Sequence, residues 1–234
     1  MFSDDLARYG PGTKFPPLSP AESRRYCRRL ARRHYENFAV LSLFLPRRLR
    51  QHVANVYAYC RWADDLADEI GDLQRSLELL DWWEAQIGDC YQGRAAHPVF
   101  TALSETIQKF HIPAEPFRDL LVAFRQDQRQ TRYETAEDLL EYCRHSANPV
   151  GRLVLSLGEC RDAEMDRLSD AICSGLQNLD VVIKNIFGHH YFGRGRLAVD
   201  GLGLSLHRRD LVHGWLVAMG NLVDTIAKRD HGPV

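Results

Sequence analysis

The stretch VYAYCRWADDLADE, residues 56–69, carries the strongest chemical signal in this chain. Four of its last six residues are acidic. On a helix, Asp64 and Asp68 stand at i,i+4 and project from one face, where their like charges repel unless a cation lies between them. Mg²⁺ suits such a pair, because it prefers carboxylate and phosphate oxygens and commonly bridges one or two carboxylates to a diphosphate. The pattern therefore predicts a Mg²⁺ site, held by Asp64 and Asp68, for a diphosphate.

The side of the helix on which each of these residues lies makes the prediction more specific. At about 100° per residue, the apolar residues form a broad arc that contains Asp64, with Asp68 and Arg61 at its edge and with Asp65 and Glu69 outside it. A dry, unpaired carboxylate among core residues is costly, so we expect Asp64 to line the polar end of an internal cavity. Asp65 points outward in this pattern and should have only a supporting role. The arc consists of Val53, Val56, Tyr57, Cys60, Ala63, Leu66, Ala67 and Ile70.

Other interpretations of the acidic run are weaker. A solvated patch at a helix end, neutralised by Arg47, Arg48 or Arg50, would be the usual explanation, but the apolar arc favours a cavity. Nucleotide binding lacks support, since neither GxxxxGK[ST] nor a GxGxxG after a strand is present. A zinc site lacks histidine or cysteine at ligand spacing around the aspartates.

Composition limits the remaining classes. The chain has 234 residues, 45% of them hydrophobic, which suits one domain. Its 30 basic and 31 acidic residues give a formal charge of −1, so we expect no nucleic-acid partner. Six scattered cysteines indicate a reduced, cytoplasmic setting. No signal pattern or run of about 18 apolar residues is present, which leaves only peripheral contact with a membrane open.

Apolar residues recur at helical spacing along the chain, and strand-like alternation is nearly absent before residue 180. The sequence therefore predicts an all-α, single-domain helical bundle around a central cavity. Residues 1–18 contain glycines and prolines and should form an extended N-terminal arm. Residues 19–179 should form the helical domain, and 180–234, rich in glycine, a divergent and irregular C-terminal segment. Helices are expected over 19–35, 46–71, 74–91, 99–110, 116–129, 136–157 and 164–179.

Three motifs together resemble the squalene/phytoene synthases, which join two prenyl diphosphates head to head. They are HYENF at 34–38 before a Leu-Pro-Arg-Arg turn, the acidic stretch, and Arg132-Tyr133 followed by YCRHSANPVGR at 142–152. The resemblance spans about residues 19–177. The residues of the first and third motifs are most similar to those of the bacterial hopanoid-pathway branch, whose members convert presqualene diphosphate to hydroxysqualene.

The resemblance implies roles for individual residues. Arg61, Asp64 and Asp68 would form the first aspartate-rich motif, and Tyr57 would lie near the diphosphate. Tyr133 and the stretch 145–148 would lie on facing helices around the cavity, with Tyr133 sharing the catalytic role, although an ordinary structural role is equally open for each of these residues. The implied substrate-binding residues are His34, Asn37, Arg61, His145, Asn148 and Gln177, and Arg152 could equally be a surface residue.

The family's second aspartate-rich motif, LQxxNxxxDVxxD, is incomplete. Leu176 and Gln177 are present, but counting onward places Asp180 at the family asparagine, Lys184 at the first aspartate and Gly188 at the second. Only Asp180 offers a further metal ligand. The chain also ends some tens of residues earlier than the resemblance implies, and a frameshift, a truncation or a lineage that lost half its metal site would each account for this.

Two functions remain open. The first is a Mg²⁺-dependent enzyme that converts farnesyl or presqualene diphosphate to squalene or hydroxysqualene. The second is a catalytically impaired binding or assembly protein of the same fold, which the damaged second motif favours. No dinucleotide fingerprint is visible, so we expect no bound NADPH. The sequence does not indicate the oligomeric state.

Overall fold

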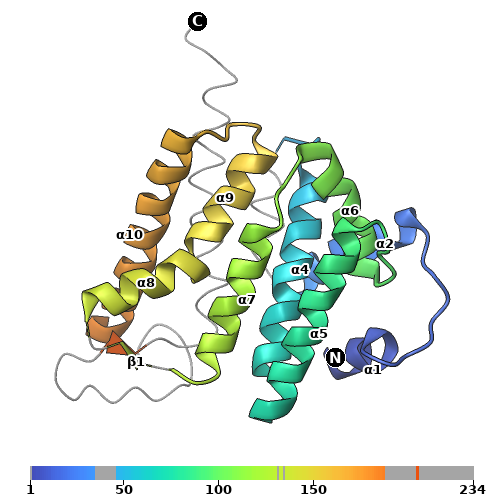
Figure 1. Cartoon of the computed structure of the whole chain (residues 1–234), viewed down its shortest axis with the longest axis horizontal. Helices are drawn as coiled ribbons and strands as arrows, with labels where there is room; N and C mark the ends of the chain where they lie inside the picture. The colour runs from blue at the N-terminus through green and yellow to red at the C-terminus, as the bar shows by residue number, and fades with distance from the viewer. Residues whose placement is uncertain (1, 35–45, 131, 134, 188–203, 206–234) are drawn as a thin grey trace, which may run out of the picture.

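The computed structural model describes residues 2–34, 46–130, 132–133, 135–187 and 204–205, and it is built from helices (Figure 1). The predicted all-α class is confirmed. A two-residue antiparallel ladder, β1 (Arg132–Tyr133) with β2 (Leu204–Ser205), is the one departure within these ranges. The helices are α1 (Phe2–Tyr9), α2 (Pro20–His34), α4 (Arg50–Asp68), α5 (Leu73–Tyr91), α6 (Pro98–Phe110), α7 (Glu115–Asp127), α8 (Ala136–Ser146), α9 (Asn148–Leu157) and α10 (Ala163–Phe187).

Helix α4 lies at the centre of the bundle, with α5 and α7 beside it and α2 and α6 packed on its other side (Figure 1). Trp62 stacks on Trp83 of α5 with ring centroids 5.1 Å apart. Tyr59 donates a hydrogen bond to the carbonyl of Phe117 in α7 at 2.8 Å. Asn55 donates to the backbone of α6 at 2.9 Å. Because neighbours surround it, α4 buries nearly all of its side chains, including those opposite the predicted apolar arc.

Local sequence signals explain where helices end. Gly71 has φ +73°, a left-handed conformation that favours glycine, and it separates α4 from α5. Thr135 and Asp138 form a capping box at the start of α8. The single helix predicted over 136–157 is wrong, because α8 ends at Ser146 and α9 begins at Asn148. Pro149 lacks an N–H group and fits the first turn of a new helix better than the middle of a long one.

The expected extended arm is also wrong for its first half, where α1 forms. Helix breakers begin only at Gly10, and two acidic residues favour the first helical turn. Phe2 packs edge-on against Trp62 at 5.2 Å, and Tyr9 against Tyr26 at 5.5 Å between ring centroids. These contacts fix α1 to the core.

Helix α10 crosses the boundary expected at residue 180 and continues to Phe187, so the helical domain does not end there. It packs closely on α9 at Gly151, where a Cβ atom would overlap Ser169 Oγ and lie 2.7 Å from Cys173 Sγ. The expectation of an irregular segment beyond Phe187 falls almost wholly outside the described residues. None of the helices described is long and apolar enough to span a bilayer.

Candidate active site

The acidic end of α4 forms a compact, buried charge cluster. Asp64 is 4% exposed and Asp65 is 1% exposed. Arg61 lies between them, with Nη1 at 3.1 Å from Asp64 Oδ2 and with Nη2 paired to Asp65 Oδ1. Asp68 follows one turn later and is partly buried. The structure thus buries Asp64, as the pattern predicted, and keeps it on the same helix face as Asp68.

The expected outward position of Asp65 is wrong. Its carboxylate is buried and paired with Arg61. The angular argument assumed that α4 has one buried face, whereas neighbouring helices cover it on several sides. Asp65 therefore belongs to the charge cluster and competes with Asp64 for the same guanidinium.

Burial dominates the protonation of these carboxylates. It raises the pKa of Asp64 well above its usual range, and the charges of Asp68, Asp65 and Asp127 raise it further, while Arg61 opposes the shift. Burial also raises the pKa of Asp65 to about 6, against the attraction of Arg61. Asp64, Asp65 and Asp68 thus form an acidic wall on α4, in which Arg61 offsets only part of the cost of burying Asp64 and Asp65. A cation bound at Asp64 would oppose the repulsion that this carboxylate receives from Asp68 and Asp127.

Two residues that we did not single out from sequence lie next to this wall. Asp127, at the end of α7, is close enough to Asp64 to raise its pKa. Tyr142 of α8 donates a hydrogen bond to Asp127 Oδ2 at 3.1 Å. Asp127 lies on the buried stripe of α7 that includes Phe117, Leu120 and Phe124. A carboxylate on an apolar stripe was the signal that identified Asp64, and the same signal could have found Asp127.

The expected helical position of Tyr133 is wrong, because this residue lies on strand β1, where it pairs with Leu204. It joins this group through Tyr142. Their rings lie 5.0 Å apart, and Gln126 Nε2 donates to Tyr133 Oη at 3.3 Å. Burial raises the pKa of both tyrosines. Tyr57, one turn before Arg61, is 1% exposed, and burial raises its pKa as well. All three side chains are therefore neutral phenols at physiological pH, able to donate hydrogen bonds.

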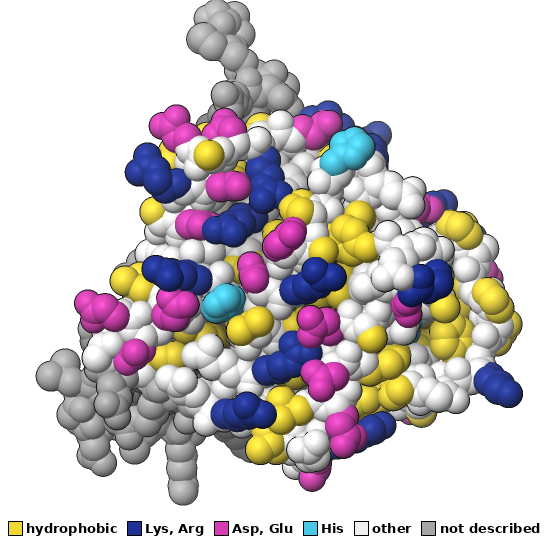
Figure 2. All heavy atoms as spheres, in the orientation of Figure 1, with side chains coloured by type: hydrophobic (Ala, Val, Ile, Leu, Met, Phe, Trp, Pro, Cys, Tyr) yellow, Lys and Arg dark blue, Asp and Glu magenta, His cyan; other side chains and the backbone are white. Residues whose placement is uncertain are grey.

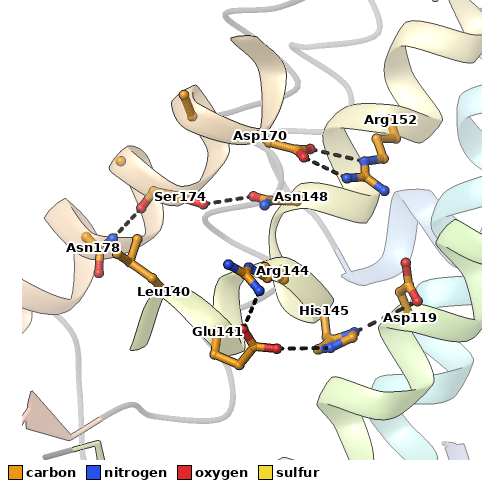
Figure 3. A pocket seen from close by; sticks show the side chains of 12 residues that line it. Asp119, Leu140, Glu141, Arg144, His145, Asn148, Arg152, Asp170, Ser174 and Asn178 are labelled. Atoms are coloured by element: carbon orange, nitrogen blue, oxygen red, sulfur yellow. Dashed lines mark hydrogen bonds and ion pairs between the residues drawn. The ribbon is translucent and has the colours of Figure 1, made fainter. Parts of the chain in front are cut away.

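His145 and Asn148 lie elsewhere. They line an open hollow of about 750 Å³ on α7, α8, α9 and α10, and neither Asp64 nor Asp68 belongs to its lining (Figure 3). His145 Nδ1 lies 3.8 Å from Asp119 Oδ1, and Asn148 Oδ1 accepts from Ser174 Oγ at 2.9 Å. On α8, Tyr142 is buried and reaches Asp127, whereas His145, about one turn further along the helix, is partly exposed and lines the hollow.

The same hollow contains Arg152, which makes a two-pronged ion pair with Asp170 at 3.1 and 2.6 Å (Figure 3). Arg152 therefore occupies a partly exposed position, one of the two alternatives left open from sequence. The grouping of His145 and Asn148 with the carboxylates is not seen in the structure. A central cavity bounded by the α4 carboxylates stays a prediction.

The remaining predicted residues are only partly described. Gln177 on α10 is 3% exposed, and its Nε2 has no hydrogen-bond partner within the described ranges. His34 ends α2, and Asp180 lies on α10, but their side chains are outside what the structure describes. Asn37 lies wholly outside it.

The donor set fits Mg²⁺ in part. Asp64 and Asp68 provide two hard oxygen ligands on one helix face, and Mg²⁺ commonly takes one or two carboxylates and completes its shell with water and phosphate oxygens. Among the residues that the structure describes, no three histidine, cysteine or acidic side chains converge as a ready-made metal site. Asp127 of α7 is a further carboxylate near Asp64, and a second metal-binding wall on α10 stays a prediction.

Comparison with known proteins places this chain in a family. Residues 31–199, more than half of the chain, match the squalene/phytoene synthase family model, so the chain belongs to the squalene/phytoene synthase family. This confirms the resemblance of the motifs.

A crystal structure of squalene synthase HpnC from Alicyclobacillus acidocaldarius is similar, with 47% identity and a TM-score of 0.67, over 73% of this chain and 64% of that one. Hydroxysqualene synthase of Rhodopseudomonas palustris is 39% identical over 61% of this chain and 48% of its own length. Phytoene synthase of Arthrospira platensis is 29% identical over 85% of this chain and 68% of its own length. The chain therefore spans between about half and two thirds of these relatives.

Proposed function

We propose that this chain is a Mg²⁺-dependent prenyl-diphosphate enzyme of squalene and hopanoid biosynthesis. Its substrate would be farnesyl or presqualene diphosphate, and its product squalene or hydroxysqualene, formed with loss of diphosphate. The observation that carries the proposal is the buried Asp64 beside Arg61 and one turn before Asp68. The identity to a squalene synthase and a hydroxysqualene synthase supports this branch over phytoene synthesis.

In this proposal, Asp64 and Asp68 hold the metal, with Asp180 as a candidate third ligand. When bound, Mg²⁺ would supply positive charge that stabilises the departing diphosphate. Arg61 already has two carboxylate partners, so its first role is to fix their positions. A metal on Asp64 would leave Arg61 freer to donate a charge-assisted hydrogen bond to a diphosphate oxygen.

The tyrosines would act on the cation left after diphosphate departs. Tyr57, Tyr133 and Tyr142 are buried and neutral, so they exclude water without introducing charge. Aromatic faces also stabilise cations near them. Water capture of the cation formed from presqualene diphosphate would give hydroxysqualene and release a proton. Attack by a second farnesyl unit on a farnesyl cation would give presqualene diphosphate and release a proton, and squalene would form from it only with a hydride donor such as NADPH.

The alternative function is a binding or assembly protein that retains the fold without full catalysis. Lys184 favours it, because it stands on α10 where the family pattern has an aspartate. Lysine supplies a point charge but no anionic ligand, so half of the metal site would be missing. The cytoplasm, with peripheral contact to the membrane that receives an apolar product, is the setting that we propose for either function.

Product analysis separates these functions. Purified protein would be incubated with farnesyl, presqualene or geranylgeranyl diphosphate, with and without Mg²⁺ and NADPH. Hydroxysqualene formed with Mg²⁺ and without NADPH would support the proposal. Squalene would require a hydride from a reductant such as NADPH, so squalene formed only when NADPH is supplied would keep the branch but overturn the expectation that no NADPH binds. Phytoene from the geranylgeranyl substrate would reassign the branch, whereas binding without any product would support the alternative.

A further inference from the structure

The basic face of α2 stands apart from the rest of the molecular surface. On the face shown in Figure 2, lysine and arginine side chains are interleaved with aspartate and glutamate. Helix α2, in contrast, has six arginines and one acidic residue within PAESRRYCRRLARRH. Since the whole chain has a formal charge of −1, the residues outside α2 together carry −6. Helix α2 therefore has a net charge of +5, in contrast to the net negative charge of the rest of the chain.

The helix geometry gathers these arginines on one side. They occur as three adjacent pairs, each four residues after the last, and together cover about half of the helix circumference. The opposite half is buried through Tyr26, Cys27, Leu30 and Ala31. The side of α2 that carries the six arginines is thus directed away from the core along the length of the helix. The pairs are Arg24 and Arg25, Arg28 and Arg29, and Arg32 and Arg33.

The two arginines at the flank have partners inside the protein. Arg24 pairs with Glu105 of α6 at 2.6 Å, and both side chains are 36% exposed. Arg28 donates to Gln51 of α4, a neutral partner. These contacts hold α2 against the bundle and set its outer face toward solvent.

The outer row keeps its charge. Arg25, Arg29, Arg32 and Arg33 are exposed, and no carboxylate within the described part of the chain forms an ion pair with any of them. Arg29 lies over the ring of Tyr26 at 5.6 Å, a contact that orders the guanidinium without neutralising it. The row we call the arginine face is defined by these four residues.

We propose that the arginine face binds the anionic surface of a phospholipid bilayer. Guanidinium groups match phosphate oxygens with two parallel hydrogen bonds, and a row of four on one helix face can meet a flat array of phosphates at once. The residues outside α2 carry a net charge of −6, which repels a polyanion that wraps around the protein, such as nucleic acid. A flat surface that meets only the arginine face avoids this repulsion. None of the exposed large hydrophobic residues of the described chain lies on α2, so the contact is electrostatic and does not require insertion.

This proposal does not depend on catalysis, although it accords with the proposed function, whose substrate and product carry long apolar chains. A juxtamembrane arginine contributes roughly a five-fold increase in partition to anionic bilayers, and the effect fades beyond the Debye length of about 10 Å at 0.1 M salt. Loss of all four arginines should therefore lower partition on the order of several hundred-fold at low salt.

The test is co-sedimentation of the full chain with vesicles of phosphatidylcholine alone or with about 30% phosphatidylglycerol. The variant changes Arg25, Arg29, Arg32 and Arg33 to glutamine, which keeps helix propensity. A matched control changes four exposed arginines on other helices and loops, Arg94, Arg118, Arg129 and Arg167, to glutamine. Circular dichroism confirms that both variants are folded.

We expect wild type and control to bind the anionic vesicles at low salt and to dissociate from them at high salt. Neither should bind vesicles of phosphatidylcholine alone, and the arginine-face variant should not bind the anionic vesicles. Equal binding by the arginine-face variant, equal loss in both variants, or binding to phosphatidylcholine alone would overturn the proposal. Tighter binding to an oligonucleotide that displaces the vesicles would also overturn it in favour of a nucleic-acid partner. Because no substrate is present, these outcomes are independent of whether the proposed reaction occurs.

Discussion

The acidic end of α4 and the C-terminal half of α10 are the two helical segments from which the family pattern would build a two-sided metal site. On α4, Asp64 and Asp68 are present and Arg61 organises the cluster. On α10, the corresponding positions hold Asp180 and Lys184, yet the helix continues to Phe187 without interruption. Helix formation depends on propensity and apolar spacing, whereas metal binding depends on a few residue identities. The fold can therefore persist where the chemistry has changed.

This difference leads to a specific account of the site. The α4 wall retains two carboxylates for Mg²⁺, while Lys184 could replace part of the positive charge of a second metal but none of its ligands. We therefore expect diphosphate binding with weaker Mg²⁺ dependence, and slow turnover or none. The following experiments test the two sides of this comparison.

The largest effect on stability should come from Arg61→Met. Removing one member of a buried ion pair leaves an uncompensated buried charge and costs about 3–5 kcal/mol. The cost should shrink in acid, because the pKa values of Asp64 and Asp65 are already raised and their protonation removes the unpaired charge. Urea unfolding near pH 8 and pH 5 would measure both effects.

Arg75→Met is the matched control for that variant. Its partner Glu78 is exposed, and such surface pairs contribute about 0–1 kcal/mol. Equal losses for the Arg61 and Arg75 variants would show that the α4 cluster is not a buried network.

His97 tests the packing on the other side of α4. Its ring lies 4.6 Å from that of Trp62, its Nδ1 accepts from Val99 N–H, and burial lowers its pKa to about 3. The unfolded chain protonates this histidine below about pH 6.5 and the folded chain does not, so folding stability falls as pH drops from there toward 3. Between pH 7 and pH 4 the loss should be about 3 kcal/mol.

The measurement is the pH dependence of unfolding for wild type and His97→Asn, which retains a capping side chain. The variant should lack this part of the acid dependence. The exposed His111, changed to asparagine, should leave the wild-type slope in place. Parallel pH profiles for wild type and His97→Asn would show that the ring is protonated in the fold.

Asp64→Asn probes the intact wall itself. Even residues that only support a metal ligand typically change metal affinity by 10–100-fold, so loss of a ligand should weaken Mg²⁺-dependent diphosphate binding on the order of 100-fold. Asp68→Asn should act similarly. The fold should be retained, because Arg61 keeps Asp65 as a charged partner and each change relieves repulsion between carboxylates. Calorimetry with farnesyl diphosphate would measure binding, with Glu69→Gln, at the exposed C-cap of α4, as control. Unchanged affinity in both aspartate variants would exclude metal-bridged recognition.

The smallest effect concerns how α10 is held. Gly151→Ala would push a methyl group into Ser169 and Cys173 of α10, which should destabilise the fold by about 1–3 kcal/mol. Gly175→Ala on α10 meets nothing within 4 Å and should raise stability by up to about 1 kcal/mol. Thermal unfolding of both variants provides the comparison, and a neutral Gly151→Ala would mean that the α9–α10 contact is looser than described.

Periodicity was informative where a helix has one buried face. It identified the fold class and the burial of Asp64, and the same rule would have found Asp127 on the apolar stripe of α7. It failed for Asp65, because α4 is surrounded and its supposed outer face is buried too.

Motif resemblance was less informative about orientation. It grouped His145 with the carboxylates, although Tyr142 is the residue of this motif that contacts Asp127. Tyr142 and His145 lie on similar sides of α8 but about one turn apart along it, so membership of one motif does not say which residues share a site. The break at Pro149 was readable from sequence but was outweighed by continuous apolar spacing across it.

The most direct test of the account replaces residues 178–234 with the corresponding region of a complete family member and compares product formation by the two proteins. Farnesyl and presqualene diphosphate would be supplied over a range of Mg²⁺ concentrations. We predict that the chimera turns over substrate with strong Mg²⁺ dependence, at a rate on the order of 100-fold or more above that of the natural chain, because it restores a second set of charge-stabilising ligands. A natural chain that forms product as fast as the chimera would contradict the account and show that a second wall is either present in another form or dispensable.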